Sequence, residues 1–542
     1  TGIDVTGSVV SDGMSTNTLG TSNFVAGVNA GNSITSGGNY NTVVGDEAGT
    51  AITTGDSNTA VGYAALDANT TATQNTAVGY QALSANITGV DNTGIGANAL
   101  FDNTTGGANT ALGVGALANN TTASNNTAIG RSALVGNTTA SENTAMGFES
   151  LTANTTGNSN TGIGEAALRG NTTANNNTGI GRQALYTNTS GANNTAVGKA
   201  ALFANTTANS NTAVGYTALT ANTTGSEMTA VGGLALAAAT TATGGTAVGF
   251  RSLNDNTTGS WLTAVGYDSL GKNTTGNNNT ALGAFALDAN TTADNNTAVG
   301  YASLGANTTG YGNTANGYQS LASNTTGYNS TATGYQAGYG ITSGVENVHI
   351  GYRAGYHNYS HTTGSRCVII GAYADVTTAG ATDAQVIGQD VNGQGGYTTI
   401  GSGAADIRAL NGTATWATVS DERYKKDIVD STAGLSFINA LQPRTFKYKT
   451  LGELPETFSA YEADSTEVFK NANTNHGFIA QEIKAAIDAD SSIADGFKLW
   501  DDREDGSQEV AEAALIPVLV KAIQELSTQN AALEARLTAL EA

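Results

Sequence analysis

The sequence predicts a mainly β protein: a trimeric parallel β-solenoid, or β-roll, of 17-residue coils, followed by a small α+β domain that ends in a coiled-coil helix. Three observations support this fold class. A 17-residue unit repeats through most of the 542 residues, the composition changes near residue 419, and a heptad pattern closes the chain. Abundant Gly and Asn with little charge would indicate disorder in an aperiodic chain, but a strict period indicates a repeat fold.

A typical repeat unit is Asn-Thr-Ala-Val-Gly-Tyr-Gln-Ala-Leu-Ser-Ala-Asn-Ile-Thr-Gly-Val-Asp, residues 75–91, and its residues define positions one to seventeen. Gly fills the fifth position 19 times in succession, from Gly45 to Gly351. Leu fills the ninth position 16 times, from Leu66 to Leu321. The fourth position is Val, Ile, Leu or Met until Val299 and is then lost at Asn316.

Each unit is too short for two packed helices, and its Gly, Thr and Asn content disfavours helix. One solenoid coil fits instead, with backbone groups of successive coils paired at ~4.8 Å. We expect the fourth-position Val and the ninth-position Leu to form columns inside, and identical Asn or Thr side chains to form hydrogen-bonded ladders. Because so few apolar side chains fill each coil, neighbouring chains are expected to supply further burial, which predicts a homotrimer.

The pattern divides the chain into four parts. Residues 1–30 are expected to be a stalk or attachment segment, and residues 31–405 the repeat array, regular over 41–351 and irregular over 352–405. Residues 406–419 are expected to form a linker, and residues 420–542 a separate domain. The array and linker carry 30 charged side chains in 419 residues, whereas the last 123 residues carry 34.

The last segment, residues 516–542, has apolar positions spaced alternately four and three residues apart, which is typical of a coiled-coil seam. Asn530 falls in the same series, where a polar side chain sets the register. The alternative is a helix packed on its own domain. The expected trimer seam consists of Leu519, Ile523, Leu526, Asn530, Leu533, Leu537 and Leu540.

Composition excludes several classes of partner. A formal charge of −22 disfavours nucleic acid and anionic membranes, which require a basic surface. No apolar run approaches 18 residues, so no membrane insertion is expected. His349, His357 and His361 lie close in sequence, but their spacing fits no firm ligand pattern, and we expect no metal and no cofactor. Core or exposed histidines explain them better.

Eleven of the 20 tyrosines lie between residues 301 and 397. Four share one repeat position and are expected to stack along one face, and a further pair shares another position. Aromatic surfaces beside Asn, Thr and Asp suit sugar rings, so we expect a receptor-facing segment there. The alternative is a ladder that covers the roll or packs between chains. The candidates are Tyr301, Tyr318, Tyr335 and Tyr352, with Tyr311 and Tyr328 as the second pair.

Two resemblances extend this interpretation. Units that read Asn-Thr-Ala-Val-Gly resemble the head domains of trimeric autotransporter adhesins, over roughly residues 30–405. The C-terminal part has four blocks in order: Ser-Asp-Glu-Arg-Tyr-Lys-Lys-Asp at 420–427, Gly-Leu-Ser-Phe-Ile-Asn-Ala-Leu at 434–441, Arg-Thr-Phe-Lys-Tyr at 444–448, and His-Gly-Phe-Ile-Ala-Gln-Glu-Ile at 476–483. This order is similar to the C-terminal intramolecular chaperone domain of endosialidases and of other phage tailspikes and fibres.

The second resemblance implies a domain that trimerises the fibre, guides its folding and then cuts itself off. It implies Ser420 as nucleophile, Lys425 as base, and cleavage of the bond between Val419 and Ser420, with Lys426 as the alternative base. The chemistry is reasonable because a serine hydroxyl needs a base, and a lysine can serve when burial lowers its pKa. A helix from residue 420 would bring Lys425 back toward Ser420. The same residues also read as an ordinary helix N-cap.

The expected function is therefore that of a structural, receptor-binding tail fibre of a bacteriophage, part of the virion tail and made in the host cytoplasm. Its expected partners are a host cell-surface glycan or protein and, at the N-terminal end, the phage tail or baseplate. No turnover enzyme is expected beyond a single cleavage in cis. The alternatives are a bacterial trimeric adhesin, an ice-binding solenoid, and a fibre with a glycanase site between chains.

Overall fold

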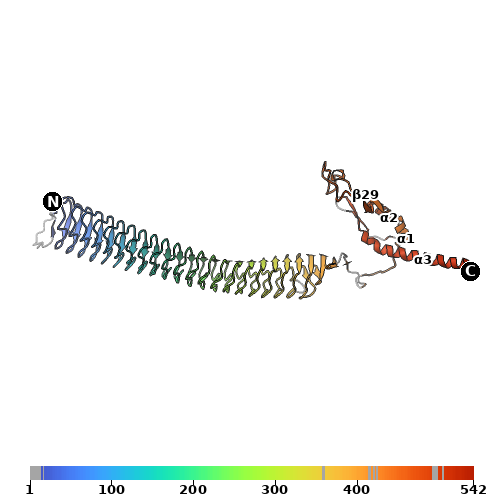
Figure 1. Ribbon diagram of the computed structural model, residues 1–542, viewed down its shortest axis with the longest axis horizontal. Coiled ribbons are helices and arrows are strands. Elements are labelled where there is room, and N and C mark those ends of the chain that lie inside the picture. Colours follow the sequence, from blue (N-terminus) through green and yellow to red (C-terminus); the bar gives the residue numbers. More distant parts are fainter. Residues whose placement is uncertain are drawn as a thin grey trace. The chain divides into compact units, whose positions relative to one another are not determined.

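The computed structural model describes residues 14–15, 18–356, 361–403, 405–412, 417–418, 422, 425–490, 493, 499–502 and 506–541. The chain forms two compact units, Thr1–Val419 and Ser420–Ala542. In the first unit short strands stack one above another along a rod (Figure 1).

Each regular coil of the rod contributes one short strand. The strands are β1 (Met14–Ser15), β2 (Phe24–Ala26), β3 (Thr42–Val44), β4 (Thr59–Val61), β5 (Thr76–Val78), β6 (Thr93–Ile95), β7 (Thr110–Leu112), β8 (Thr127–Ile129), β9 (Thr144–Met146), β10 (Thr161–Ile163), β11 (Thr178–Ile180), β12 (Thr195–Val197), β13 (Thr212–Val214), β14 (Thr229–Val231), β15 (Thr246–Val248), β16 (Thr263–Val265), β17 (Thr280–Leu282), β18 (Thr297–Val299), β19 (Thr314–Asn316), β20 (Thr331–Thr333), β21 (Val348–Ile350) and β22 (Val368–Ile370).

Neighbouring strands from β2 to β22 pair in parallel and in register, so that equivalent repeat positions face each other. Thr195 pairs with Thr212, and Val197 with Val214. The backbone N–H of Gly198 donates to Ile180 O at 2.8 Å, and the same bond recurs coil after coil. The predicted parallel β-solenoid of 17-residue coils is confirmed.

The core differs from the prediction at one position. The ninth-position Leu is buried as expected, for example Leu83, but the fourth-position Val is not inside, so that expectation was wrong. The buried strand residue is the third-position Ala, such as Ala77. Successive side chains of a strand point to opposite faces, so burial of the third position turns the second and fourth positions outward.

The fifth-position glycines explain why the coils stack closely. Gly215 has φ +141°, a backbone conformation open to glycine alone, and a Cβ built on it would lie 2.4 Å from the carbonyl oxygen of Gly232 in the next coil. The ninth-position leucines have φ near +50°, for example 53° at Leu219. A β-branched side chain is strongly disfavoured there, which accounts for Leu rather than Val or Ile.

Two Asn ladders fill the rest of the interior, at the first and twelfth positions. Asn103 Nδ2 donates to Asn86 Oδ1 at 2.8 Å and to Gly106 O at 2.9 Å. Asn75 N donates to Asn58 Oδ1 at 3.0 Å, and Asn75 Nδ2 donates to Gly89 O at 2.9 Å. Most buried amides of the ladders therefore find partners in their own coil and in the adjacent one, although Asn143 Nδ2 has none among the described residues. These bonds reduce the penalty for burying the amides.

The ends of the rod depart from the expected boundaries. β2 lies in the segment expected to be a stalk, but it already pairs with β3 of the repeat array. The last coils contain β23 (Asp375–Val376), β24 (Gln385–Gln389), β25 (Asn392–Gly393) and β26 (Tyr397–Ser402). The segment expected as a linker contains β27 (Ala405–Leu410) and β28 (Ala417–Thr418), which continue the sheet in antiparallel fashion.

The second unit is small. It comprises α1 (Leu435–Ala440), β29 (Arg444–Phe446), η2 (Leu451–Glu453), β30 (Asn475–Gly477), α2 (Ala480–Ala489), β31 (Trp500–Asp502), β32 (Gln508–Val510), η3 (Glu512–Ala514) and α3 (Leu515–Glu541). Phe437, Ile483, Leu499 and Val518 form its core.

Candidate functional site

The expected cleavage bond joins the last residue of the first unit, Val419, to the first residue of the second, Ser420. Val419 and Ser420 are outside the described residues. Lys425 and Lys426 are described and exposed, and the Lys425 N–H donates to Glu422 O at 2.9 Å. Residues 425–434 are not helical, and the first helix, α1, begins at Leu435. Between residues 420 and 425 the structure describes only Glu422 and Lys425, so the helical return of Lys425 toward Ser420 stays a prediction.

Two of the sequence blocks meet in the second unit. β29 and β30 pair so that Thr445 lies opposite His476. Arg444, from one block, donates from Nε to Glu482 Oε2 at 2.9 Å, and Glu482 belongs to the other block. The hydrogen bond from Arg444 holds the pKa of the Glu482 carboxyl below its usual value. These two blocks thus contact each other in the folded unit.

The helix α3 has two faces with different environments. Leu515, Val518 and Ala522 are buried, as in the alternative of a helix packed on its own domain. The heptad residues that are predicted to form the trimer seam do not face the core of the unit. They are exposed, from 41 % at Leu519 to 83 % at Leu540. Glu525 Oε2 also accepts the Leu435 N–H at 2.9 Å, so the buried side of α3 holds the start of α1.

The four tyrosines predicted to stack do so. Ring centroids are 5.4 Å apart between Tyr301 and Tyr318, 5.1 Å between Tyr318 and Tyr335, and 5.2 Å between Tyr335 and Tyr352. Sequence reasoning missed the extent of this aromatic ladder. It continues through Phe250, Tyr267, Phe285 and Tyr373. Phe285 and Tyr373 stand one position later in their coils, which hides the continuity from a fixed-period search.

The ladder leaves mainly ring edges and hydroxyls accessible. The rings of Tyr318 and Tyr335 are nearly parallel to their neighbours, with interplanar angles of 6–12°. Beside them runs a polar row, in which Gln336 Nε2 donates to Gln319 Oε1 at 2.9 Å and Arg353 Nε donates to Gln336 Oε1 at 3.1 Å. Phenol, amide and guanidinium groups thus lie next to one another on this surface.

The second tyrosine pair also stacks. The rings of Tyr311 and Tyr328 lie 4.9 Å apart at 2°. Tyr311 is half-exposed.

His349 and His361 are buried core residues, and His357 lies outside the described residues. Ala381 O can only accept a hydrogen bond, so His361 Nε2, 3.1 Å away, donates to it. His361 Nδ1 then accepts from His349 Nε2 at 3.2 Å. Burial lowers the pKa of both, that of His349 to about 3. Among the described residues no group of three or more His, Cys, Asp or Glu could hold a metal ion.

The nearby thiol of Cys367 is buried and donates to Ala381 O at 3.2 Å, and burial raises its pKa. It is therefore a core thiol rather than a reactive one.

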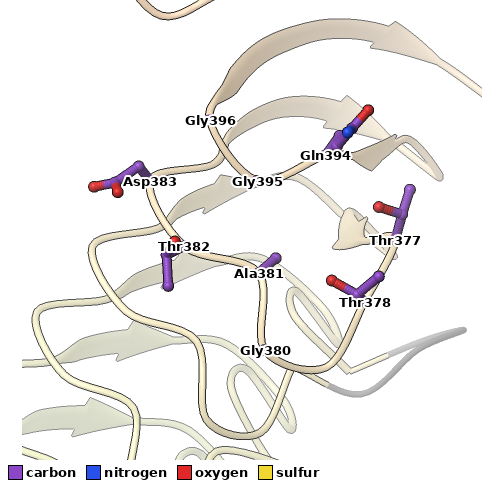
Figure 2. A pocket seen from close by; sticks show the side chains of 9 residues that line it. All are labelled: Thr377, Thr378, Gly380, Ala381, Thr382, Asp383, Gln394, Gly395 and Gly396. Atoms are coloured by element: carbon purple, nitrogen blue, oxygen red, sulfur yellow. The ribbon is translucent and has the colours of Figure 1, made fainter.

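An open recess of about 490 Å³ lies near the end of the solenoid. The coil that begins at Ala384 has 13 residues instead of 17, as the spacing from Gly388 to Gly401 shows. Segments 377–383 and 394–396 line the recess with Thr, Ala, Asp and Gln side chains and with the backbone of three glycines (Figure 2). Asp383 is held at its rim by Arg366, which donates from Nε at 2.7 Å and lowers the pKa of the carboxyl.

Within the described part of the chain, no helix is long and apolar enough to cross a bilayer. Residues 420–490 match the model of a peptidase family described as chaperone of endosialidase. The match begins at the predicted nucleophile and contains all four sequence blocks. Among curated proteins no match to the chain was found.

Proposed function

We propose that the chain is a structural, receptor-binding tail fibre of a bacteriophage, assembled as a homotrimer by a C-terminal chaperone domain that then removes itself. One observation carries this proposal. A segment matching the chaperone of endosialidase follows directly after a long β-solenoid. The exposed heptad face of α3 supports association of several copies, since exposed Leu and Ile at a and d positions are typical of coiled-coil partners.

The proposed cleavage takes place within the chain, and its steps balance. The Lys425 amine, in its neutral form, takes the proton of the Ser420 hydroxyl, and the Ser420 oxygen attacks the Val419 carbonyl carbon. The peptide C–N bond breaks, its nitrogen receives that proton, and an ester joins Val419 to the Ser420 oxygen. Water then hydrolyses the ester, which leaves a Val419 carboxylate and a free Ser420 amine.

Lys425 is exposed in the single chain, whereas a lysine loses its proton more readily where it is desolvated. Other copies of the chain would supply that desolvation. We therefore expect cleavage to depend on assembly, and disruption of the heptad face by Leu526→Asp and Leu533→Asp together should slow it.

Intact-mass analysis and a denaturing gel test the cleavage. The wild-type chain should release a fragment that ends at Val419, and Ser420→Ala should abolish it. Ser431→Ala, a change at a nearby described serine, is the matched control and should cleave normally. A comparison of the cleavage of Lys425→Ala with that of Lys426→Ala identifies the base. Cleavage that persists in Ser420→Ala contradicts the assignment of the nucleophile.

We place receptor contact on the ladder segment from Tyr301 to Tyr373, because a row of phenol groups beside Gln319, Gln336 and Arg353 offers both apolar edges and hydrogen-bond donors to a glycan. Tyr318→Ala with Tyr335→Ala should reduce attachment to host cells. The control is Tyr63→Ala with Tyr80→Ala, a pair stacked at 5.5 Å at the other end of the array. Equal attachment by the two double variants would contradict a role of the ladder in receptor binding.

A further inference from the structure

The outer face of the solenoid sheet carries an apolar column. In each coil from β3 to β18 the fourth position is Val, Ile, Leu or Met, and these side chains point away from the core. They are partly or substantially exposed, up to 45 % at Leu112 and 47 % at Leu282. The second-position Thr of each strand points outward beside them. We call these two columns the outer sheet face.

The outer sheet face is uncharged. From β3 to β22 the second and fourth positions contain neither acidic nor basic residues, although the chain as a whole has a formal charge of −22. Other outward positions do carry charge: Glu165 and Arg182 occupy the sixth position, and Asp268 the seventh. Strongly acidic chains repel one another, so copies approach more readily on an uncharged surface than on a charged one.

We propose that the outer sheet face, over residues 42–299, is the surface along which copies of this chain pack together, parallel and in register. This rests on the proposed function, because it assigns a face to the trimer. The spacing of the coils indicates that the partner on this face is a second copy of the chain. A second copy presents an aliphatic side chain at the same ~4.8 Å strand spacing and can therefore match every coil. The exposed heptad face of α3 is an independent surface suited to the same partner.

The outer sheet face is large enough for a specific interface between two chains. Sixteen strands at ~4.8 Å spacing form a strip roughly 75 Å long. At a width of about 10 Å, its area approaches the ~800 Å² per partner of a standard specific interface. The aliphatic column is interrupted at Asn316 and Thr333, so contact between copies is expected to weaken in those coils, which carry Tyr318 and Tyr335.

Cysteine cross-linking tests the assignment. Val214→Cys puts a thiol on the outer sheet face, and in register it lies beside the same thiol of another copy. Thr207→Cys puts a thiol on an exposed corner of the same region and is the matched control. The wild-type chain sets the baseline because Cys367 is buried. After mild oxidation, a non-reducing denaturing gel should show a covalent pair of chains for Val214→Cys at least fivefold more abundant than for Thr207→Cys.

A second variant tests the energetic role of the face. Val214→Asn with Val231→Asn should fold, since Asn316 occupies the same position in a regular strand, but should weaken association at least tenfold in sedimentation equilibrium. If the wild type is oligomeric but Val214→Cys cross-links no better than Thr207→Cys, the face assignment is overturned while the proposed fibre stands. If the wild type sediments as a monomer, both fail.

Discussion

The regular coils and the last coils of the same solenoid follow one backbone path with different interiors. In the regular coils a Leu at the ninth position and Asn at the first and twelfth fill the core. In the coils that begin at Ser330 and Asn347, the ninth position is Gly338 and Gly355. Nevertheless β20, β21 and β22 remain parallel and in register. The backbone ladder therefore tolerates a change of core provided that the space is filled.

His349 fills that space. It stands at the third position, where the coils of β4 to β20 have Ala or Gly, and it is completely buried. A Cβ added to Gly355 would lie 2.2 Å from His349 Cδ2, and one added to Gly338 would lie 3.2 Å from His349 Nδ1. The large side chain has thus moved from the ninth position to the third. The comparison shows that a smaller residue at one core position of a coil is compensated by a larger residue at another.

The largest expected effect tests what both regions share, the glycine column. Gly215→Val introduces a side chain where φ is +141° and where Cβ would lie 2.4 Å from the next coil. We expect a loss of ~4 kcal/mol or more, since backbone conformation and packing fail together. Hydrogen exchange should show lost protection in the adjacent coils.

Gly115→Asn is the matched control for that change. Gly115 has φ +65° and nothing within 4 Å of its Cβ position, and Asn is among the residues that adopt this conformation most readily. Equal damage from both variants would show that glycine is required for a reason other than the approach of the next coil.

Restoring the regular core in an irregular coil is the second test. Gly355→Leu alone should destabilise this end of the solenoid, because the new side chain overlaps His349. In a His349→Ala background the same change should be accommodated. We expect a coupling energy of about 2 kcal/mol in a double-mutant cycle of denaturant unfolding. Additive effects would contradict the exchange of volume between positions three and nine.

The third test uses pH, because the buried histidines of the described residues, His349 and His361, both lie in these last coils. The pKa of His349 is lowered to about 3 by burial, so the unfolded chain binds more protons than the folded one below pH 6.5. The stability contributed by neutral His349 is fully present above pH 6.5 and is lost as pH falls toward about 3. Near pH 5.5 the slope should approach ~1.4 kcal/mol per pH unit.

The pH effect should be local. Hydrogen exchange should report acid destabilisation around β21 and β22 but not around β12 and β13, where the core holds no ionisable group. His349→Ala should make the profile less steep, with a remaining slope from His361, whose pKa burial also lowers. An unchanged profile in that variant would assign the acid sensitivity to other groups.

The smallest expected effect concerns the aromatic ladder. Tyr318→Ala should reduce stability by about 1 kcal/mol, the usual size of a stacked aromatic contribution beyond area burial. Tyr80→Ala, at the end of the array where the ladder is only a stacked pair, should lose a similar amount or less. Thermal unfolding followed by circular dichroism compares the two, and a much larger loss at Tyr318 would mean that the long ladder acts cooperatively.

The sequence by itself determined the period, and the period determined the stacking. Because equivalent residues recur every 17 positions, parallel in-register pairing places like beside like, which predicts the Asn ladders and the row from Tyr301 to Tyr352. The heptad pattern predicted a trimer seam on α3; its residues are exposed in the single chain, and the seam stays a prediction. The C-terminal blocks predicted the match over residues 420–490, while the roles of Ser420 and Lys425 stay predictions.

Only the tertiary structure decided which side of each strand faces inward. Within Thr-Ala-Val both Ala and Val are apolar, so a three-residue strand has no alternation strong enough to choose a face. The close approach of the coil walls admits Ala77 and leaves Val78 outside. The free exchange of Val, Ile, Leu and Met at the fourth position, against unbroken Leu at the ninth, was the available signal. A half-exposed site tolerates different shapes, whereas a buried residue with positive φ does not.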